Sequence, residues 1–269
     1  MNNYSTIENL RKIAGTLPSE EPIRRTKYLS LIDSIEVSLE DHNENPYKTM
    51  FVTATATWGD NQYEQKWNKT SAEGKLEVIK AVLTNNTLPQ AREMVNFVFR
   101  VRGTPRWMFD YHTQIKFTSF MSIGCRDNNK IDCDFIFDQE TKIDKDIKSN
   151  LESLKDLYEY VLNQGGGSWQ SARTFLPQCY QHSYHFGQNL LSIASMKNFR
   201  VLNTLEDATL FKLYLEIYEK ISKKFPLIGL HISSIFRKDN REIFDTISKL
   251  ELKDIKQEDL NLLDKNYAN

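Results

Sequence analysis

The sequence predicts an α+β fold in which a small mixed or antiparallel sheet is packed against a larger number of helices. Stretches that alternate apolar and polar residues interleave with longer stretches of helical period, and the helical stretches outnumber the others. No glycine-rich turn of the G-x-G-x-x-G or P-loop type follows any strand-like stretch. Dinucleotide-binding and P-loop folds are therefore disfavoured.

The composition is that of an ordinary globular protein. The chain has 269 residues, with 35 basic and 36 acidic residues, a net charge of −1 and three cysteines. A chain of this length can bury a substantial core without disulfides, and its balanced charge provides no field that would attract nucleic acid or an anionic membrane. We expect a cytoplasmic protein with reduced thiols, no structural zinc, no membrane span and no direct nucleic-acid binding.

The first half of the chain carries most of the strand signals. Residues 34–57 alternate and are rich in valine and threonine, which predicts two strands separated by a polar turn. A helix is predicted after Ser71, which is a suitable N-cap, and it extends to about residue 85. Residues 94–103 alternate again and predict a strand.

The second half is mainly helical. Thr104, Pro105 and Arg106 predict a helix start, because proline suits the first helical turn. That helix leads into a polar break at residues 116–129, the kind of segment in which sites are often found. The remaining predictions are a strand at 132–138, a helix at 142–164, a short element at 171–177, a helix or a helix flanked by extended chain at 178–200, and an amphipathic helix ending at Pro226.

The pattern predicts three units. Residues 1–33 form an N-terminal helical extension, residues 34–226 form the main domain, and residues 227–269 form a C-terminal helical appendage.

Basic residues gather around the polar break, where guanidinium forks, hydroxyls and backbone N–H groups could converge on a phosphate. The alternative is that each is solvated or paired with a local acid. Arg173 and Arg200 lie in apolar or neutral segments, so each needs an anionic partner from elsewhere. The residues around the break are Arg100, Arg102, Arg106, Lys116 and Arg126.

Metal and thiol chemistry have weaker signals. His182 and His185 have the spacing of two ligands on a helix, but no carboxylate motif completes a site, so these histidines and His112 are more simply core or surface residues. Cys125 precedes Arg126, which would lower the pKa of an exposed thiol, but no base is identifiable beside it.

In order and spacing, residues 34–226 resemble the flavin-dependent thymidylate synthases (ThyX). The segment ATATWG stands where that family has A-R-V-S-Y, with Thr57 at the hydroxyl position, and NNTLPQAR stands where it has G-H-x-T-P-x-E-H, with Arg92 inside the motif. The signature R-H-R-x-x-S-x-N-x-x-S-x-R falls on residues 114–126 and keeps Ser119 and Arg126, with Lys116 for its third residue.

The downstream half matches better. The family's A-R-x-x-L-P is present at residues 172–177, its asparagine twelve residues later is Asn189, and its later arginine is Arg200. The resemblance implies a small sheet with helices, assembled as a homotetramer with active sites between subunits. It also implies FAD stacked against dUMP, methylene transfer from methylenetetrahydrofolate to C5 of dUMP, and NADPH as the reductant of the flavin.

The resemblance also assigns roles to individual residues. Gly124 stands where the family has the serine that approaches uracil, with Ser122 and Cys125 beside it. This departure keeps two alternatives open: a different pyrimidine nucleotide, for example in hydroxymethylation for DNA modification, or a flavin-free nucleotide-binding protein. The implied catalytic residues are Ser122, Gly124 and Arg200; the substrate-binding residues are Tyr111, Gln114, Gly124, Cys125, Arg126, Arg173 and Arg200; and the cofactor-binding residues are Thr57, Arg92, Gln114, Lys116, Ser119 and Asn189.

Overall fold

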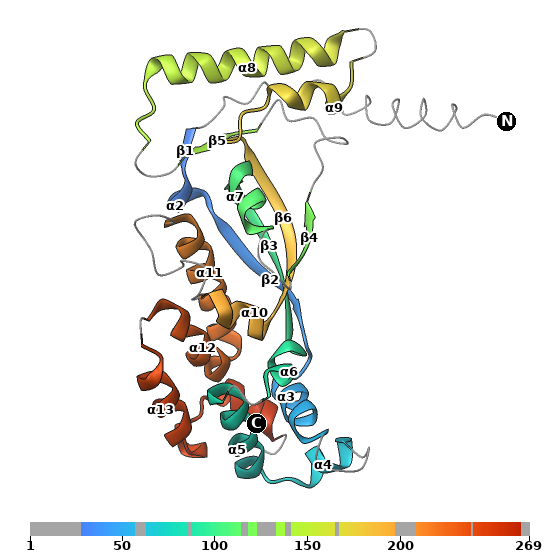
Figure 1. Cartoon of the computed structure of the whole chain (residues 1–269), viewed down its shortest axis with the longest axis vertical. Helices are drawn as coiled ribbons and strands as arrows, with labels where there is room; N and C mark the ends of the chain where they lie inside the picture. The colour runs from blue at the N-terminus through green and yellow to red at the C-terminus, as the bar shows by residue number, and fades with distance from the viewer. Residues whose placement is uncertain are drawn as a thin grey trace, which may run out of the picture.

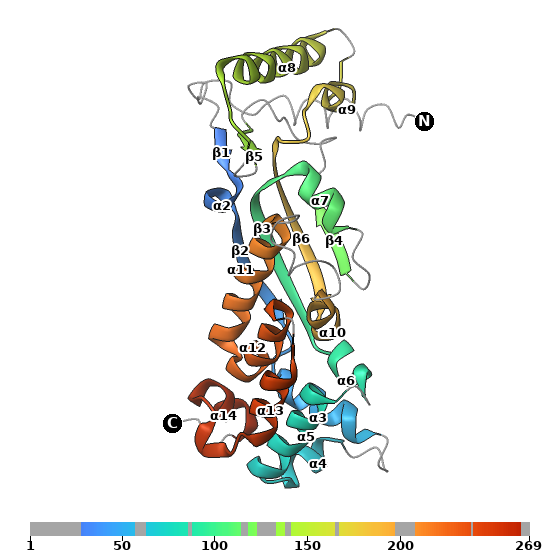
Figure 2. The same cartoon turned by 60° about the vertical axis from the view of Figure 1, so that its left-hand side comes forward.

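The computed structural model describes residues 28–56, 63–85, 88–113, 118–122, 133–137, 141–164, 167–196, 208–237 and 239–264. These residues form an elongated molecule with a sheet at its centre and helices at both ends (Figures 1 and 2). No described helix is long and apolar enough to cross a membrane.

The central sheet has four strands, β2 (Glu36–His42), β3 (Asn96–Pro105), β6 (Gln181–Asn189) and β4 (Thr118–Ser122). Their order in the sheet is β2-β3-β6-β4, and every neighbouring pair is antiparallel. A second, two-stranded sheet pairs β1 (Tyr28–Ser30) with β5 (Phe135–Phe137) in parallel. The predicted α+β class with a small, mainly antiparallel sheet is confirmed.

Helices pack beside the sheet and fill both ends of the molecule (Figure 1). Helices α8 and α9 lie at the end that carries β1 and β5, and α3 to α5 lie at the opposite end with α13 and α14 (Figures 1 and 2). The helices are α2 (Leu31–Ser34), α3 (Pro46–Thr55), α4 (Tyr63–Lys69), α5 (Ala72–Thr84), α6 (Pro89–Glu93), α7 (Arg106–His112), α8 (Lys145–Asn163), α9 (Trp169–Ala172), α10 (Leu190–Ala194), α11 (Ala208–Lys224), α12 (Pro226–Ile232), α13 (Arg241–Lys249) and α14 (Gln257–Leu263), with 3-10 turns η2 (Arg173–Phe175), η4 (Ser233–Phe236) and η5 (Leu252–Asp254).

One face of the central sheet is buried beneath helices. Phe97, Phe99 and Phe186 on this face are at most 1% exposed, and Phe99 and Phe186 stack with ring centroids 5.1 Å apart. Helix α11 packs against β2, and α7 packs against β3 and β6. Each buried aromatic side chain contributes roughly 1.5–3 kcal/mol through loss of apolar contact with water. This covered face therefore holds the sheet and the helices together.

The second strand predicted within residues 34–57 is wrong, because Pro46–Thr55 is helix α3. The helix begins where the Asn45 side chain accepts a hydrogen bond from the Lys48 N–H, with Pro46 in the first turn. Tyr47, Met50, Phe51 and Ala54 are buried at helical spacing. The run of valines and threonines fitted a strand, but burial of this helical face decides the structure.

Two boundaries in the second half also differ from the prediction. Residues 181–189 form β6 and only 190–194 form a helix, so the prediction of extended chain beside a helix is correct and a single helix is wrong. Pro105 ends β3, and α7 begins at Arg106. The predicted helices after Ser71, at 142–164 and before Pro226 are confirmed as α5, α8 and α11.

Two buried lysines of α5 bind the ends of the C-terminal helices. The Lys75 ammonium donates to the Leu263 carbonyl at the end of α14 (2.9 Å), and the Lys80 ammonium donates to the Leu250 carbonyl just after α13 (2.9 Å). A cation at a helix C-terminus satisfies carbonyls that the helix leaves unpaired and opposes the helix dipole. The C-terminal helices are thereby fixed to α5.

A buried carboxylate makes a further connection to the same helices. Asp259 of α14 accepts hydrogen bonds from the Tyr47 hydroxyl (2.5 Å) and from the Leu227 backbone N–H (2.8 Å). Burial raises the pKa of Asp259 to about 6. The main hydrophobic core includes Ile35 near one end of the described chain and Leu263 near the other, together with apolar side chains of α12, α13 and α14. The predicted boundaries at residues 33 and 226 stay predictions, and residues 1–27 lie outside the described residues.

Replacing Lys75 with methionine tests the contact with α14. Methionine keeps an apolar stem but removes the ammonium, which also lies 4.5 Å from the Trp67 ring centroid. We expect Lys75→Met to lower the free energy of unfolding by about 2 kcal/mol, because a hydrogen bond from a charged group is lost inside the protein. Chemical denaturation measures this change.

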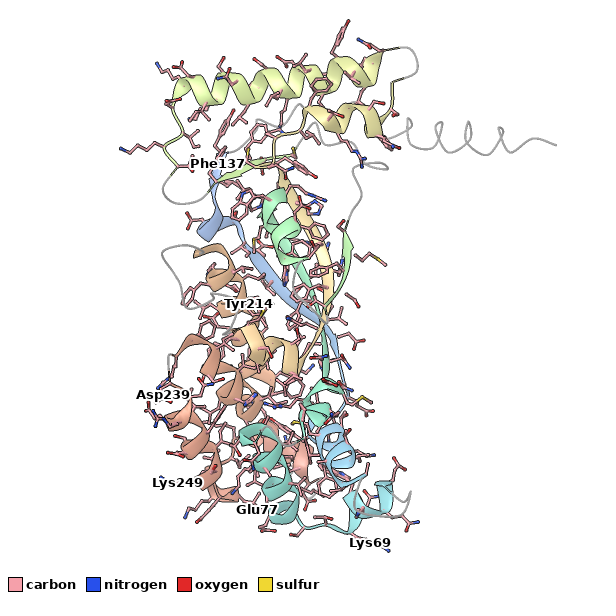
Figure 3. The ribbon with its side chains drawn as sticks, viewed as in Figure 1. Lys69, Glu77, Phe137, Tyr214, Asp239 and Lys249 are labelled. Atoms are coloured by element: carbon pink, nitrogen blue, oxygen red, sulfur yellow. The ribbon has the colours of Figure 1, made fainter. Side chains whose placement is uncertain are left out.

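The matched control is Lys69→Met. Lys69 is exposed at the end of α4, at the lower end of the molecule in Figure 3, so its replacement should change stability by less than about 0.5 kcal/mol. Equal effects of the two substitutions would show that the α5 contact with α14 does not stabilise the fold.

Candidate functional site

The other face of the central sheet is not covered by any described helix. Two rows of paired residues cross all four strands on this face. None of their members is buried, and Met121 is 76% exposed. We call this surface the open face; its rows are Ser38, Arg100, His185 and Met121, and Asp41, Val98, Gly187 and Ser119.

The open face carries a cationic side chain one row away from a glycine. Arg100 pairs in register with His185, and within the described part of the chain the Arg100 side chain forms no ion pair. Gly187 lies between Val98 and Ser119, and a Cβ added to Gly187 would meet only the Phe97 carbonyl oxygen, at 4.0 Å. The packing of the chain therefore does not require glycine here. Glycine within a strand often marks close approach of a ligand or another backbone.

Two of the predicted cofactor-binding residues meet on this face. Ser119 is directly opposite Gly187, and Asn189 is two residues further along the same strand as Gly187. Such diagonal neighbours lie roughly 7–8 Å apart, within reach of one ligand. The Asn189 side-chain oxygen accepts a hydrogen bond from the Ser192 N–H (2.8 Å) and caps α10, which leaves the amide NH₂ group as a donor.

The other described site residues lie elsewhere. Ser122 pairs with Tyr184 in a row on the covered face, so it points away from Ser119. Arg173 is exposed on η2, before β6 begins, whereas Asn189 ends that strand. At about 3.4 Å per residue, β6 alone separates them by roughly 30 Å. Arg92 is buried in α6 beside His231 rather than on the open face.

The remaining predicted site residues cannot be placed on this surface. Helix α7 includes Tyr111, whose side chain lies outside the described residues. The residues wholly outside the described ranges are Thr57, Gln114, Lys116, Gly124, Cys125, Arg126 and Arg200.

The three histidines considered for a metal have different positions. His182 and His185 lie on opposite faces of β6, because residues three apart in a strand point in opposite directions. His112 is fully buried, with its two ring nitrogens 3.0 Å from the Tyr184 hydroxyl and 3.2 Å from the Tyr214 hydroxyl (Tyr214 is labelled in Figure 3). In the described ranges, no three histidine, cysteine, aspartate or glutamate side chains gather to hold a metal ion.

The position of His112 also resolves one alternative. The sequence left open whether His112 is a core or a surface residue, and it belongs to a buried hydrogen-bond network under the sheet. The network continues from the Tyr214 hydroxyl to the Gln188 side chain (3.1 Å) and from there to the Ser192 hydroxyl (3.0 Å). Because the Ser192 N–H donates to the Asn189 side chain that caps α10, this network supports the end of β6 where Asn189 lies.

Sequence reasoning did not identify the open face as one surface. Arg100 was expected in a cationic cluster and His185 beside His182, but only the register of β3 and β6 shows that Arg100 and His185 are neighbours. The available signal was the alternation of residues 181–189, which separates His182, Tyr184 and Phe186 from Ser183, His185 and Gly187.

The described residues of the open face could accommodate a ligand that has a planar ring with a polar edge. Gly187 provides space, Ser119 provides a hydroxyl, and Asn189 provides amide hydrogens at the edge of that space. Arg100 adds a cation in the next row. The geometry thus matches the chemistry of a flavin or nucleotide ring better than that of a metal ion, which requires clustered ligands.

The chain is similar in fold to two solved structures whose names refer to pyrimidine nucleotides. One is the UMP/dUMP methylase PolB from Streptomyces cacaoi bound with 5-Br dUMP, with a TM-score of 0.60 and 13% identity over 77% of this chain and 97% of that chain. Another is thymidylate synthase X (ThyX) from Helicobacter pylori with FAD and dUMP, with a TM-score of 0.54 and 12% identity over 80% of this chain and 100% of that chain. At these identities the similarity establishes the fold alone.

The class defined by the fold is therefore a ThyX-like α+β protein with one open sheet face. Residues 38–227 match the family Thy1, Thymidylate synthase complementing protein, and the chain belongs to this family. No curated protein matches the sequence.

The buried histidines predict a specific dependence of stability on pH. Burial lowers the pKa of His112 and of His231 to about 3, and the nearby Arg92 charge contributes at His231. Both stay neutral in the folded protein, while in the unfolded chain they take up protons below about pH 6.5. Stability should therefore fall as the pH falls from about 6.5 towards 3, by roughly 1.4 kcal/mol per pH unit for each histidine.

The variant His231→Leu isolates one of these contributions. We compare its free energy of unfolding with that of the original chain at each pH. The contributions of the carboxylates that titrate in the same range, including Asp259, are the same in both proteins and cancel. The difference between the two should be flat above about pH 6.5 and should favour the variant increasingly below it. A difference that does not change with pH would show that His231 is not held neutral by burial.

Proposed function

We propose that this protein is a flavin-dependent, thymidylate synthase-like enzyme that transfers a one-carbon unit from methylenetetrahydrofolate to C5 of dUMP. The observation that supports this most strongly is the meeting of Ser119 and Asn189 on the open face, in a chain of the Thy1 family. FAD would supply the hydride that completes the methyl group, and NADPH would reduce the flavin.

In this proposal the open face binds and orients the flavin ring. Gly187 would leave space for the ring, the Ser119 hydroxyl and the Asn189 amide would hold its polar edge, and Arg100 would contribute positive charge nearby. The role of Asn189 depends on its cap of α10, because that hydrogen bond fixes the orientation of the amide. Gln114, Lys116 and Thr57 complete the flavin contacts.

The phosphate of the nucleotide would be bound by arginines. Arg126 and Arg173 provide bidentate forks for it, and Arg200 reaches the pyrimidine. Ser122 lies in a row on the covered face, so of the three residues implied in catalysis we assign the approach to the base to Gly124 and Arg200. Gly124 would offer a backbone N–H where a serine would offer a hydroxyl, and we assign Tyr111 and Cys125 to the binding of the substrate as well.

The site would be assembled between subunits of a homotetramer. Arg173 and Asn189 are separated by the whole of β6, roughly 30 Å at the usual rise of a strand, which is longer than a nucleotide stacked on a flavin ring can span. If both serve one site, they come from different copies of the chain. The position of Arg92, buried beside His231, suits a structural role in this assembly better than direct contact with the flavin.

A second candidate substrate is UMP. The structural similarity to PolB includes the form bound with 5-Br UMP, with a TM-score of 0.56 and 15% identity over 79% of this chain and 98% of that chain. A base-facing glycine in place of serine leaves room for a changed substrate or a hydroxymethyl product. UMP and dUMP differ by one hydroxyl, and a site that hydrogen-bonds this hydroxyl can discriminate strongly between them.

The experiment is a visible absorbance titration of the purified protein with FAD and then with dUMP, followed by mass spectrometry after adding methylenetetrahydrofolate and NADPH. We expect a flavin band that shifts on addition of dUMP, and thymidylate as the product, with UMP giving a smaller shift. A larger shift with UMP than with dUMP would identify UMP as the substrate. A product with the mass of a hydroxymethyl nucleotide would show that the reaction is hydroxymethylation. Absence of bound flavin after the protein has been saturated with FAD and separated from free FAD by gel filtration would contradict the flavoenzyme and leave a nucleotide-binding protein.

A further inference from the structure

We infer that the chain has a second ligand site, which binds an aromatic organic anion and shares only Ser38 with the rows of the open face. The site is a cavity of about 670 Å³ formed by β2, the C-terminal end of α11, and α14. Its volume lies in the range of pockets that bind small molecules. None of the residues predicted to bind the nucleotide or the flavin lines it.

The floor of this cavity is apolar and includes aromatic rings. Leu39, Phe225 and Leu262 line it, and His42 packs edge-on against Phe225 with ring centroids 5.0 Å apart. Leu39 and Leu262 remain only partly buried although they pack against the core. A planar hydrophobic body bound on this floor would remove their exposed surface from water.

His42 provides a defined polar group at the edge of the floor. Its Nδ1 lies 2.6 Å from the Asn43 carbonyl oxygen, which can only accept, so Nδ1 carries the proton. In the neutral ring, Nε2 is then an acceptor, and in the described part of the chain no group bonds to it. A ligand that carries an N–H or O–H group can be recognised there.

Three lysines form the wall of the cavity on α11. Lys220, Lys223 and Lys224 are spaced i, i+3 and i+4, so they lie on one face of the helix. All three are exposed, and none forms an ion pair with a described residue. Positive charges at this spacing repel one another. The partial negative charge of the helix C-terminus offsets this repulsion mainly for Lys223 and Lys224, which lie in the last turn. A bound anion would also balance the charge of Lys220.

The charges of the lining favour an anion, although acids are present. Glu44 and Glu258 also line the cavity, from the loop after β2 and from α14. The three lysines stand together on one helix, whereas the two glutamates come from different elements. An anionic group therefore binds at the α11 wall, with the aromatic body on the floor and any N–H donors towards the acids or His42.

The test is a fluorescence titration of the full-length protein with 8-anilinonaphthalene-1-sulfonate, an aromatic anion whose emission rises in an apolar site. We expect saturable binding with one site per chain. In the triple variant Lys220→Gln, Lys223→Gln and Lys224→Gln, the dissociation constant should rise at least about tenfold. Leu262→Trp, which fills the floor and keeps the lysines, should also weaken binding at least about tenfold.

The matched control removes three exposed lysines that do not line the cavity. This control variant makes the same change in net charge and combines Lys142→Gln, Lys145→Gln and Lys249→Gln. Of these residues, Lys249 lies on α13 (Figure 3). The control variant should bind the probe as the original chain does. Equal weakening in both triple variants, or unchanged binding in Leu262→Trp, would overturn the proposal. These results are independent of the proposed enzyme activity.

Competition experiments then identify the anionic group. Displacement of the probe by phenyl phosphate would support an aromatic phosphate ester, and displacement by benzoate an aromatic carboxylate. Displacement by inorganic phosphate as effective as that by phenyl phosphate would overturn the requirement for an aromatic body. In the variant that lacks the three lysines of the α11 wall, neither aromatic competitor should displace the probe.

Discussion

The structure depends on a sheet that is buried on one face only. The rows that contain Phe97, Phe99 and Phe186 attach the sheet to α7 and α11, and the network from His112 through Tyr214 to Gln188 satisfies the polar groups buried among them. An antiparallel sheet tolerates this asymmetry because its strands need only one covered side. The consequence is an open face whose side chains are available for binding.

Contacts at one end of the molecule and under the sheet contribute to the stability of that face. At one end, buried Lys75 and Lys80 fix the C-terminal helices, and Asp259 connects α14 to α3 and α12. At the sheet, Ser192 and Asn189 link the buried network to the cap of α10. Groups held by such contacts keep their geometry without a ligand, and preorganised groups of this kind bind more tightly.

The sequence predicted the fold class. It also predicted those helices and strands whose residues follow a single clear periodicity. Helices α5, α8 and α11 and strands β2 and β3 have clear caps or clear alternation. Helix α3 was missed because residues 46–55 fit both periods, and β6 was partly missed because buried His182 and Gln188 conceal its apolar face. Site predictions were limited for a related reason: motif order brought Ser119 and Ser122 together, but strand register places them in rows on opposite faces.

The measurement that tests this account most directly is the dUMP-induced shift of the flavin spectrum in Gly187→Val. Valine suits a strand, and a Cβ at this position has ordinary van der Waals space, so thermal unfolding should occur at the same temperature or higher. Because its side chain would occupy the open face, we expect the shift to disappear, whereas the control Ser38→Val at the edge of the same face should keep it. A normal shift in folded Gly187→Val would contradict the assignment of the site to the open face.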